Sequence, residues 1–301
     1  MTLCRQSVLL ALLSGMIGCN RIDYPSGPLP TAPPLPPLAE PVSRAIEGRS
    51  VLLFFDEQHL VPIFCHDHGR RLFGADCATL LPTTALVDLH LSGGLVAQLG
   101  PAAESRCVWN GKALPSYAVT GLGTQSQTVT AALWSDTSYP LLSSPPLPVE
   151  IQPRTPSQQR GMKAACAQLA VAGSPTQVEL IETWNVDLDG DGVRERLDEL
   201  RCIDERRQQV IGQSVVVTAG RHPERTVPMR AVTDNSSTVQ PIAVADVDSN
   251  GVPEVVIKTA SPDRTRFELG HLDGVGLSSL VEIECRPSQK KTPSQPPTVK
   301  R

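Results

Sequence analysis

Residues 187–195 read DLDGDGVRE and residues 246–254 read DVDSNGVPE, so this chain of 301 residues carries the same acidic pattern twice. Both stretches fit D-x-D-x-[D/N]-G-x-x-E, and their first residues lie 59 positions apart. Alternate residues of a tight loop can turn several oxygen ligands toward one point, which hard cations require. Glycine at the sixth position permits the sharp turn that such a loop needs. The repeated pattern therefore predicts two loops that bind a divalent cation.

Every ligand expected in these loops is an oxygen atom. A set made only of oxygen favours calcium over zinc or copper. An ordinary acidic turn is the alternative, because Asp, Asn and Gly favour turns without any metal. Two matches in the same order, with the same glycine, favour the calcium interpretation. The expected ligands are the side chains of Asp187, Asp189, Asp191 and Glu195 with the carbonyl of Val193, and the side chains of Asp246, Asp248, Asn250 and Glu254 with the carbonyl of Val252.

The residues around the loops favour strands rather than the helices of an EF-hand. An EF-hand needs a glutamate at position 12, where the first loop has Asp198 and the second has Ile257. Apolar and β-branched residues precede and follow the loops, which predicts strands. These stretches are residues 183–186 (TWNV), 210–218 (VIGQSVVVT), 241–245 (PIAVA) and 255–257 (VVI).

Residues 245–257 (ADVDSNGVPEVVI) resemble the FG-GAP repeats, also called VCBS repeats, of integrin α-subunit propellers and many bacterial surface proteins. Residues 186–197 (VDLDGDGVRERL) are similar in the loop and less regular after it. The resemblance covers about residues 175–285 and implies propeller-blade-like units of strand, calcium loop and strand. Two repeats do not close a propeller. The resemblance also implies an adhesion or binding module with calcium as the cofactor.

The N-terminal residues resemble a bacterial lipoprotein signal peptide. The apolar run of residues 7–17 is too short to span a bilayer. Residues 16–19 read MIGC, which is similar to a lipobox and implies that Cys19 is lipidated. An ordinary signal peptide cleaved near Gly18 is the alternative. Asn20 stands where Asp would indicate retention in the inner membrane, so the sequence favours the outer membrane of a bacterial cell envelope.

Proline-rich segments flank the predicted folded parts. Residues 25–41 contain 8 prolines in 17 positions, which favours polyproline II. At about 3.1 Å per residue this spacer would reach about 50 Å from a lipid surface, and a disordered linker without a distance function is the alternative. The tail, residues 286–301, carries five basic residues and no acidic one. This tail either contacts anionic lipid or polysaccharide or is a solvated chain end, and the sequence leaves both alternatives open.

The cysteines agree with export. Of eight cysteines, Cys4 would leave with the signal peptide and Cys19 would carry lipid. An even number in an exported chain predicts disulfides, here three. Cys65 and Cys77 are close enough in sequence to close one loop, and the other pairings are open. The six candidates are Cys65, Cys77, Cys107, Cys166, Cys202 and Cys285.

The chain is predicted to be mainly β, with two β-rich parts. In the first part, residues 50–55 and 60–65 predict a hairpin, and Asn110-Gly111 predicts a turn. Residues 158–172 predict one helix. The expected organisation is a signal peptide (1–18), a proline-rich spacer (19–42), a β-rich domain of a family that we do not recognise (43–150), a calcium-loop domain (157–285) and a disordered basic tail (286–301).

Few residues point to catalysis. The sequence contains no H-E-x-x-H, G-x-S-x-G or phosphate-loop motif, and His66-Asp67-His68 is more typical of a solvated loop than of a metal site. We therefore expect an envelope-anchored lipoprotein that acts as a calcium-stabilised binding or scaffolding module. Its expected partners are the membrane, through Cys19, and an envelope protein or polysaccharide, with no nucleic acid. An envelope hydrolase with residues 157–285 as an accessory module is the alternative.

Overall fold

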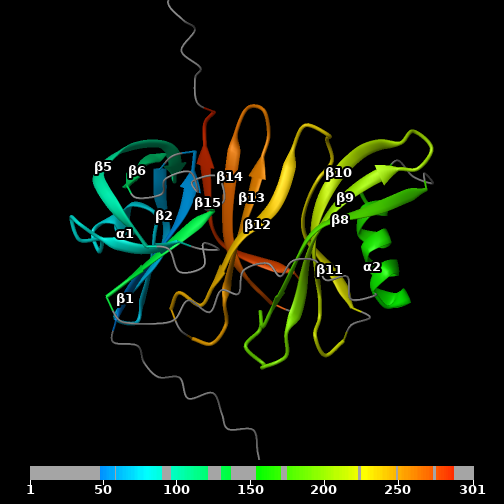
Figure 1. The fold of residues 1–301 in the computed structure, drawn as a ribbon, viewed down its shortest axis with the longest axis horizontal. Helices are drawn as coiled ribbons and strands as arrows, with labels where there is room; N and C mark the ends of the chain where they lie inside the picture. The colour runs from blue at the N-terminus through cyan, green and yellow to red at the C-terminus, as the bar shows by residue number, and fades with distance from the viewer. Residues whose placement is uncertain are drawn as a thin grey trace, which may run out of the picture. The chain divides into compact units, whose positions relative to one another are not determined.

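The computed structural model describes residues 48–57, 59–89, 96–120, 130–136, 154–170, 175–222, 225–248, 250–273 and 276–287. The protein is mainly β, as the sequence predicts, and its strands form two antiparallel sheets (Figure 1). Among the described residues there is no helix with the length and apolar character that a membrane span requires. The predicted signal peptide, the spacer and all but the first two residues of the tail lie outside the described residues.

Six strands of the larger sheet close into a ring, because each is hydrogen-bonded to the next in the order β1, β2, β6, β5, β4, β7 and back to β1. The short strand β3 extends β2 beside this ring and leads into α1. The bounds are β1 (Arg49–Asp56), β2 (His59–Asp67), β3 (Arg70–Phe73), α1 (Ala75–Ala78), β4 (Leu86–Leu89), β5 (Val96–Trp109), β6 (Lys112–Thr120) and β7 (Ala131–Ser135).

The apolar run at the start of β1 is buried on both faces. Successive side chains of a strand point to opposite sides. Val51 and Leu53 therefore belong to the core inside the ring, whereas Leu52 and Phe54 belong to a core outside it. A strand buried on both sides reads as a continuous apolar stretch rather than an alternating one, which is why the sequence predicted the hairpin but not its two-sided burial.

Four more strands extend the ring into a sheet of eleven strands. They are β12 (Thr238–Ala245), β13 (Glu254–Ala260), β14 (Thr265–Leu272) and β15 (Leu277–Cys285), called here the second meander. The last strand joins the ring where Cys285 pairs with Cys107 of β5, and a disulfide links these two residues. Strands from both predicted parts, residues 43–150 and 157–285, therefore share one sheet.

The smaller sheet is a separate meander of four strands that is covered by one helix. Its members, called the first meander, are β8 (Thr176–Val186), β9 (Glu195–Asp204), β10 (Gln209–Thr218) and β11 (Thr226–Val232). The helix α2 (Pro156–Ala167) begins with Thr155 and Gln158 in a reciprocal capping box and with proline at its first turn. The disulfide Cys166–Cys202 ties this helix to β9.

The second meander lies between the ring and the first meander (Figure 1). On its ring side, Phe267 stacks on Phe54 with the ring centroids 3.8 Å apart. On its other side, Ile257 shares an apolar cluster with Trp184 of the first meander, whose side chain is almost fully buried. Met162 of α2 packs on the far face of the first meander. The apolar layers thus continue from the helix to the ring.

Equivalent residues of the two meanders lie on the same face of their sheets, and that face packs against the next part of the protein. Residues of the first meander and its loop pack toward the second meander, and the residues 59 positions later pack toward the ring. The first set is Val186, Leu188 and Leu197, and the second is Ala245, Val247 and Val256. The first meander therefore packs on the second with the same face with which the second packs on the ring.

Candidate metal centres

Each acidic stretch connects the first two strands of its meander. The first loop (187–195) follows Val186 at the end of β8, and the second loop (246–254) follows Ala245 at the end of β12. The glutamate that ends each motif is the first residue of the returning strand. Val186 pairs with Glu195 and Ala245 pairs with Glu254, so the sheet holds both ends of each loop.

Three carboxylates converge in each loop. The first, third and ninth positions of the motif each supply one oxygen, and these oxygens lie within 4.8 Å of one another. The two sets are Asp187, Asp189 and Glu195, and Asp246, Asp248 and Glu254. Like charges this close repel one another unless a cation or protons offset them. A donor set of carboxylate oxygens suits calcium, so the residues present fit the ion that the sequence predicts.

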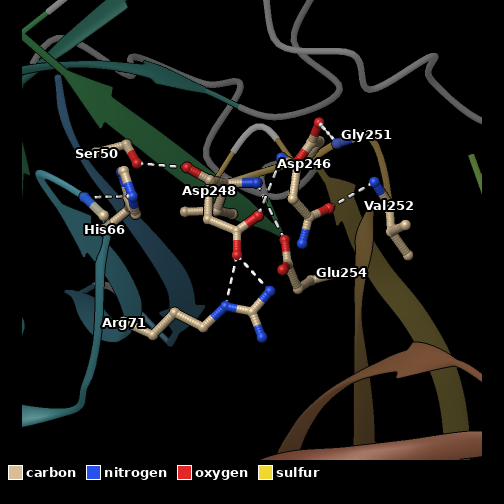
Figure 2. A network of polar contacts seen from close by, with 11 residues as sticks. Ser50, His66, Arg71, Asp246, Asp248, Gly251, Val252 and Glu254 are labelled. Carbon is tan, nitrogen blue, oxygen red and sulfur yellow. Dashed lines mark hydrogen bonds and ion pairs between the residues drawn. The ribbon is translucent and has the colours of Figure 1, made fainter. Parts of the chain in front are cut away.

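The two loops have the same internal hydrogen bonds. The glycine N–H at the sixth position donates to the first aspartate, with Gly192 N 2.8 Å from Asp187 Oδ2 and Gly251 N 2.9 Å from Asp246 Oδ2. The other matched pairs are Leu188 N to Glu195 Oε2 (2.6 Å), Val247 N to Glu254 Oε2 (3.0 Å), Val193 N to Asp191 Oδ1 (2.7 Å) and Val252 N to Asn250 Oδ1 (2.6 Å). The repeated sequence therefore corresponds to a repeated loop conformation, and Figure 2 shows the second of the two loops.

The two glutamates are the buried members of these groups. Glu195 is 2% exposed and Glu254 is 1% exposed. Burial raises the pKa of Glu195. Burial, followed by the charge of Asp248, raises the pKa of Glu254 to about 8, although the Val247 N–H and Arg71 oppose the shift. A cation beside these carboxylates would favour their charged form, because it supplies the compensation that burial removes.

One carboxylate in each loop also pairs with an arginine from outside the loop. Asp191 pairs with Arg221 at 2.5 Å, and Asp248 pairs with Arg71 at 2.5 Å. Asp191, an expected ligand, lies outside the group of three converging carboxylates because its side chain is turned toward Arg221 and Val193 N. The sequence did not point to either arginine, since Arg71 is 177 residues from its partner and no local pattern marks that contact.

The two loops lie against each other. A Cβ added at Gly190 would overlap the carbonyl oxygen of Gly251, so the first loop approaches the second at backbone distance. Beside the first loop is a cavity of about 150 Å³, with Asp189 and Arg221 among its polar lining residues and Leu272 of β14 among its apolar ones. Residues of both meanders therefore surround the first loop.

The other metal candidates do not assemble a site among the described residues. His66 is buried on β2 and its Nε2 accepts the N–H of Gly69 at 2.8 Å, whereas His68 is exposed. Asp56 lies beside the sulfur atoms of the disulfide that joins β5 to β15, but disulfide sulfurs are not thiolate ligands. Its carboxylate instead receives two N–H groups from Arg106, at 2.8 and 2.7 Å.

All six cysteines that the sequence singled out are paired. The structure contains the predicted Cys65–Cys77 loop and resolves the pairings that the sequence left open. The expected lipidation residue, Cys19, lies outside the described residues. Comparisons of the chain with protein-family models, with curated proteins and with solved structures give no match.

Proposed function

We propose that the two meanders are FG-GAP/VCBS-like units stabilised by calcium, and that the protein is a binding or scaffolding module of the bacterial cell envelope. The observation that carries this proposal is the pair of loops with matched hydrogen bonds, each placing three carboxylates within 4.8 Å. An ordinary acidic turn does not require a glutamate buried to 1–2% exposure at the same place in both copies.

The packing of the meanders supports the blade-like interpretation. Blades of a propeller are four-stranded antiparallel sheets that pack face to face in series. Here each unit has four antiparallel strands, with the acidic loop between its first two strands. Residues that lie 59 positions apart in the sequence form the packing faces of the two units. The ring occupies the place that a further blade would take beside the second meander.

Calcium would act here as a structural ion. Bound at both loops, it would offset the repulsion within each group of carboxylates and hold together the first two strands of each meander. Because the loops touch at Gly190 and Gly251, the ions would also stabilise the contact between the meanders. With calcium bound, we expect the two meanders to form a rigid pair of sheets that presents the remaining loops to a partner.

Calcium should raise the melting temperature of the full chain relative to EDTA. An ion that binds only the native state contributes RT ln(1 + [L]/Kd), about 2.7 kcal/mol at a hundredfold excess over Kd. Sites of the extracellular class have Kd values of about 10⁻⁴ to 10⁻³ M, so the test needs millimolar calcium or more. A melting temperature that stays the same in EDTA and in saturating calcium would rule out the proposed sites.

Asp234→Asn is the matched control for this measurement. Asp234 is exposed and accepts Ser236 N–H and hydroxyl bonds in an ordinary turn, at 3.0 and 2.7 Å. Its replacement should leave the calcium response intact, whereas Asp189→Ala and Asp248→Ala should each reduce it. Magnesium at equal concentration should stabilise less, because it demands a smaller octahedral site and gives up its water reluctantly.

Anchoring through Cys19 is the second element of the proposal. The lipobox-like sequence at residues 16–19 supports it, and the proline-rich spacer would hold the folded part away from the lipid. Cys19→Ser should block lipidation and leave the protein soluble or unprocessed after cell fractionation. A variant that still fractionates with membranes like the wild type would contradict the anchor.

The partner is proposed to be an envelope protein or polysaccharide. A polar cleft of about 520 Å³ lies at the opposite end of β13 from the second loop, and its lining includes Arg230, Arg264 and Arg266 together with Ser236 and Ser261. Charged and hydroxyl side chains of this kind can hydrogen-bond polar ligands. Envelope components recovered on the immobilised protein with calcium, and lost in EDTA, would support a binding module whose surface depends on the ion.

A further inference from the structure

The second loop is attached to the ring by polar contacts on two of its residues (Figure 2). Ser50 of β1 donates its hydroxyl to the carbonyl of Val247 at 2.6 Å. Arg71 of β3 donates from Nε and Nη2 to the same oxygen of Asp248, Oδ2, at 2.6 and 2.5 Å. The Asp248 side chain is 7% exposed and the Arg71 side chain is 43% exposed, so solvent and salt reach this ion pair mainly from the arginine side.

The strand that carries Arg71 is well anchored. Arg71 pairs with His66 of the neighbouring strand β2, and the disulfide between Cys65 and Cys77 encloses this hairpin. Buried His66 also accepts the N–H of Gly69 in the turn. The guanidinium therefore reaches the second loop from a strand beside the ring that pairs with β2 and lies within the segment closed by the disulfide.

Arg71 and a bound ion would compete for the same carboxylate. Asp248 Oδ1 accepts the N–H of Asn250 at 3.2 Å, and Oδ2 faces Arg71. A calcium ion among Asp246, Asp248 and Glu254 would take an oxygen of Asp248 and bring two positive charges close to the guanidinium. Positive charges at such a separation repel each other strongly in a partly buried site.

We propose that Arg71 is an internal counter-cation of the second loop, and that calcium binding there displaces it from Asp248 and loosens the β2–β3 hairpin of the ring. This inference rests on the calcium function proposed above. Without the ion, Arg71 offsets part of the negative charge of the loop. In the first loop the pair of Arg221 and Asp191 stays within one meander, so the link from ion to ring belongs to the second loop.

Calorimetric titration with calcium tests the competition in a full chain that carries Asp189→Ala, so that the second loop is the reporter. In this background Arg71→Met removes the charge and keeps most of the side-chain length. It should tighten calcium binding by about tenfold, equivalent to about 1.4 kcal/mol. Arg70→Met is the matched control, because it removes the same charge from the adjacent, opposite-facing position of β3 and should leave the affinity unchanged. In an Asp248→Ala background, Arg71→Met should have no effect.

Amide hydrogen exchange of the wild-type protein measures how strongly the β2–β3 hairpin is held, without any substitution. Saturating calcium should speed exchange of the amides in residues 70–73. Exchange that calcium does not change, or an Arg71→Met affinity equal to that of its parent, would overturn the displacement and leave calcium binding itself standing. Failure of calcium to bind both the wild type and Arg71→Met would overturn the proposed function instead. Binding that appears only after Arg71→Met would support the counter-cation role.

Discussion

The two acidic loops share a motif and a conformation, but different parts of the protein hold them. The first loop is braced by its own meander, since Arg221 and the N–H of Gly220 reach Asp191 and Glu195. The second loop is braced by the ring, through Ser50 and Arg71. The short motif thus specifies the internal geometry of each loop. The residues packed around the loop decide which of its carboxylates is paired with an arginine.

The position of the arginine differs as well. Arg221 pairs with the fifth position of the motif, Asp191, whose side chain is 26% exposed, and Arg71 pairs with the third position, Asp248, at 7%. The third position belongs to the group of converging carboxylates and the fifth does not. The second loop therefore has one of its converging carboxylates paired with an arginine, whereas in the first loop the arginine pairs with a carboxylate outside that group.

The largest effect that we expect comes from breaking the contact between the loops. Gly190 has a φ of 75°, and a Cβ there would overlap the backbone of Gly251. Gly190→Ala should cost about 3 kcal/mol of unfolding free energy, from a left-handed backbone of about 1–2 kcal/mol and an overlap of similar size. Urea unfolding in EDTA measures this cost apart from any ion.

Gly192→Ala and Gly251→Ala are the controls for that prediction. Both residues have positive φ, at 81° and 87°, and a Cβ at either would meet nothing within 4 Å. Each should therefore cost only about 1–2 kcal/mol, the backbone part alone. Equal losses for all three variants would mean that the loops do not press on each other in solution.

The turns of the two loops and the strands that flank them could be predicted because the pattern that specifies them is local. The order of aspartate, glycine and glutamate within nine residues defines the turn, and the β-branched runs on either side define the strands. The turn at Asn110-Gly111 was predictable for the same reason, and both residues have the positive φ that such a hairpin turn requires. Mainly β structure and the Cys65–Cys77 loop follow from equally short stretches.

The arrangement of the sheets could not be predicted from the sequence. The pairing of β15 with β5 rests on Cys285 and Cys107, which are separated by 178 residues, and apolar strands offer many such partners. The contact of Arg71 with Asp248 follows only after that arrangement has placed the second loop beside the ring. Long-range pairing therefore decided the surroundings of the loops, and the local pattern decided their conformation and which carboxylates converge.

A smaller effect is expected at the positions four residues beyond the glutamates, where the first meander buries a carboxyl group and the second holds a partly buried lysine. Glu199 of β9 is 7% exposed, and burial followed by the charge of Glu182 raises its pKa from 4.5 to about 7. Lys258, 59 positions later, has a pKa lowered by burial. Equivalent sites in the two meanders thus hold an acidic group and a basic group, the first buried and the second partly buried.

Glu199→Gln should stabilise the protein at pH 8. A carboxyl group whose folded pKa lies above its unfolded value costs stability as pH rises through that interval, here from about 4.5 to about 7. The glutamine variant should be more stable than the wild type by roughly 1–3 kcal/mol at pH 8, with the difference vanishing near pH 4.5. Urea unfolding at several pH values measures it, and Glu179→Gln, at an exposed position of β8, controls for the loss of one charge.

The smallest expected effect is the difference in calcium affinity between the loops. The first loop contains four carboxylates, although Asp191 is paired with Arg221, and the second contains three, because Asn250 is neutral. Each carboxylate adds attraction to a divalent ion. The arginine on Asp248 weakens the second loop further, whereas Arg194 and Arg196 beside the first loop reduce the contrast. We expect the first loop to bind more tightly by tenfold or less, about 1.4 kcal/mol at most.

In calorimetry, Asp189→Ala should therefore remove the tighter site and Asp248→Ala the weaker one. Loss of the tighter site from Asp248→Ala instead would mean that bracing by the ring prepares the second loop for the ion, and that loop geometry outweighs the number of charges.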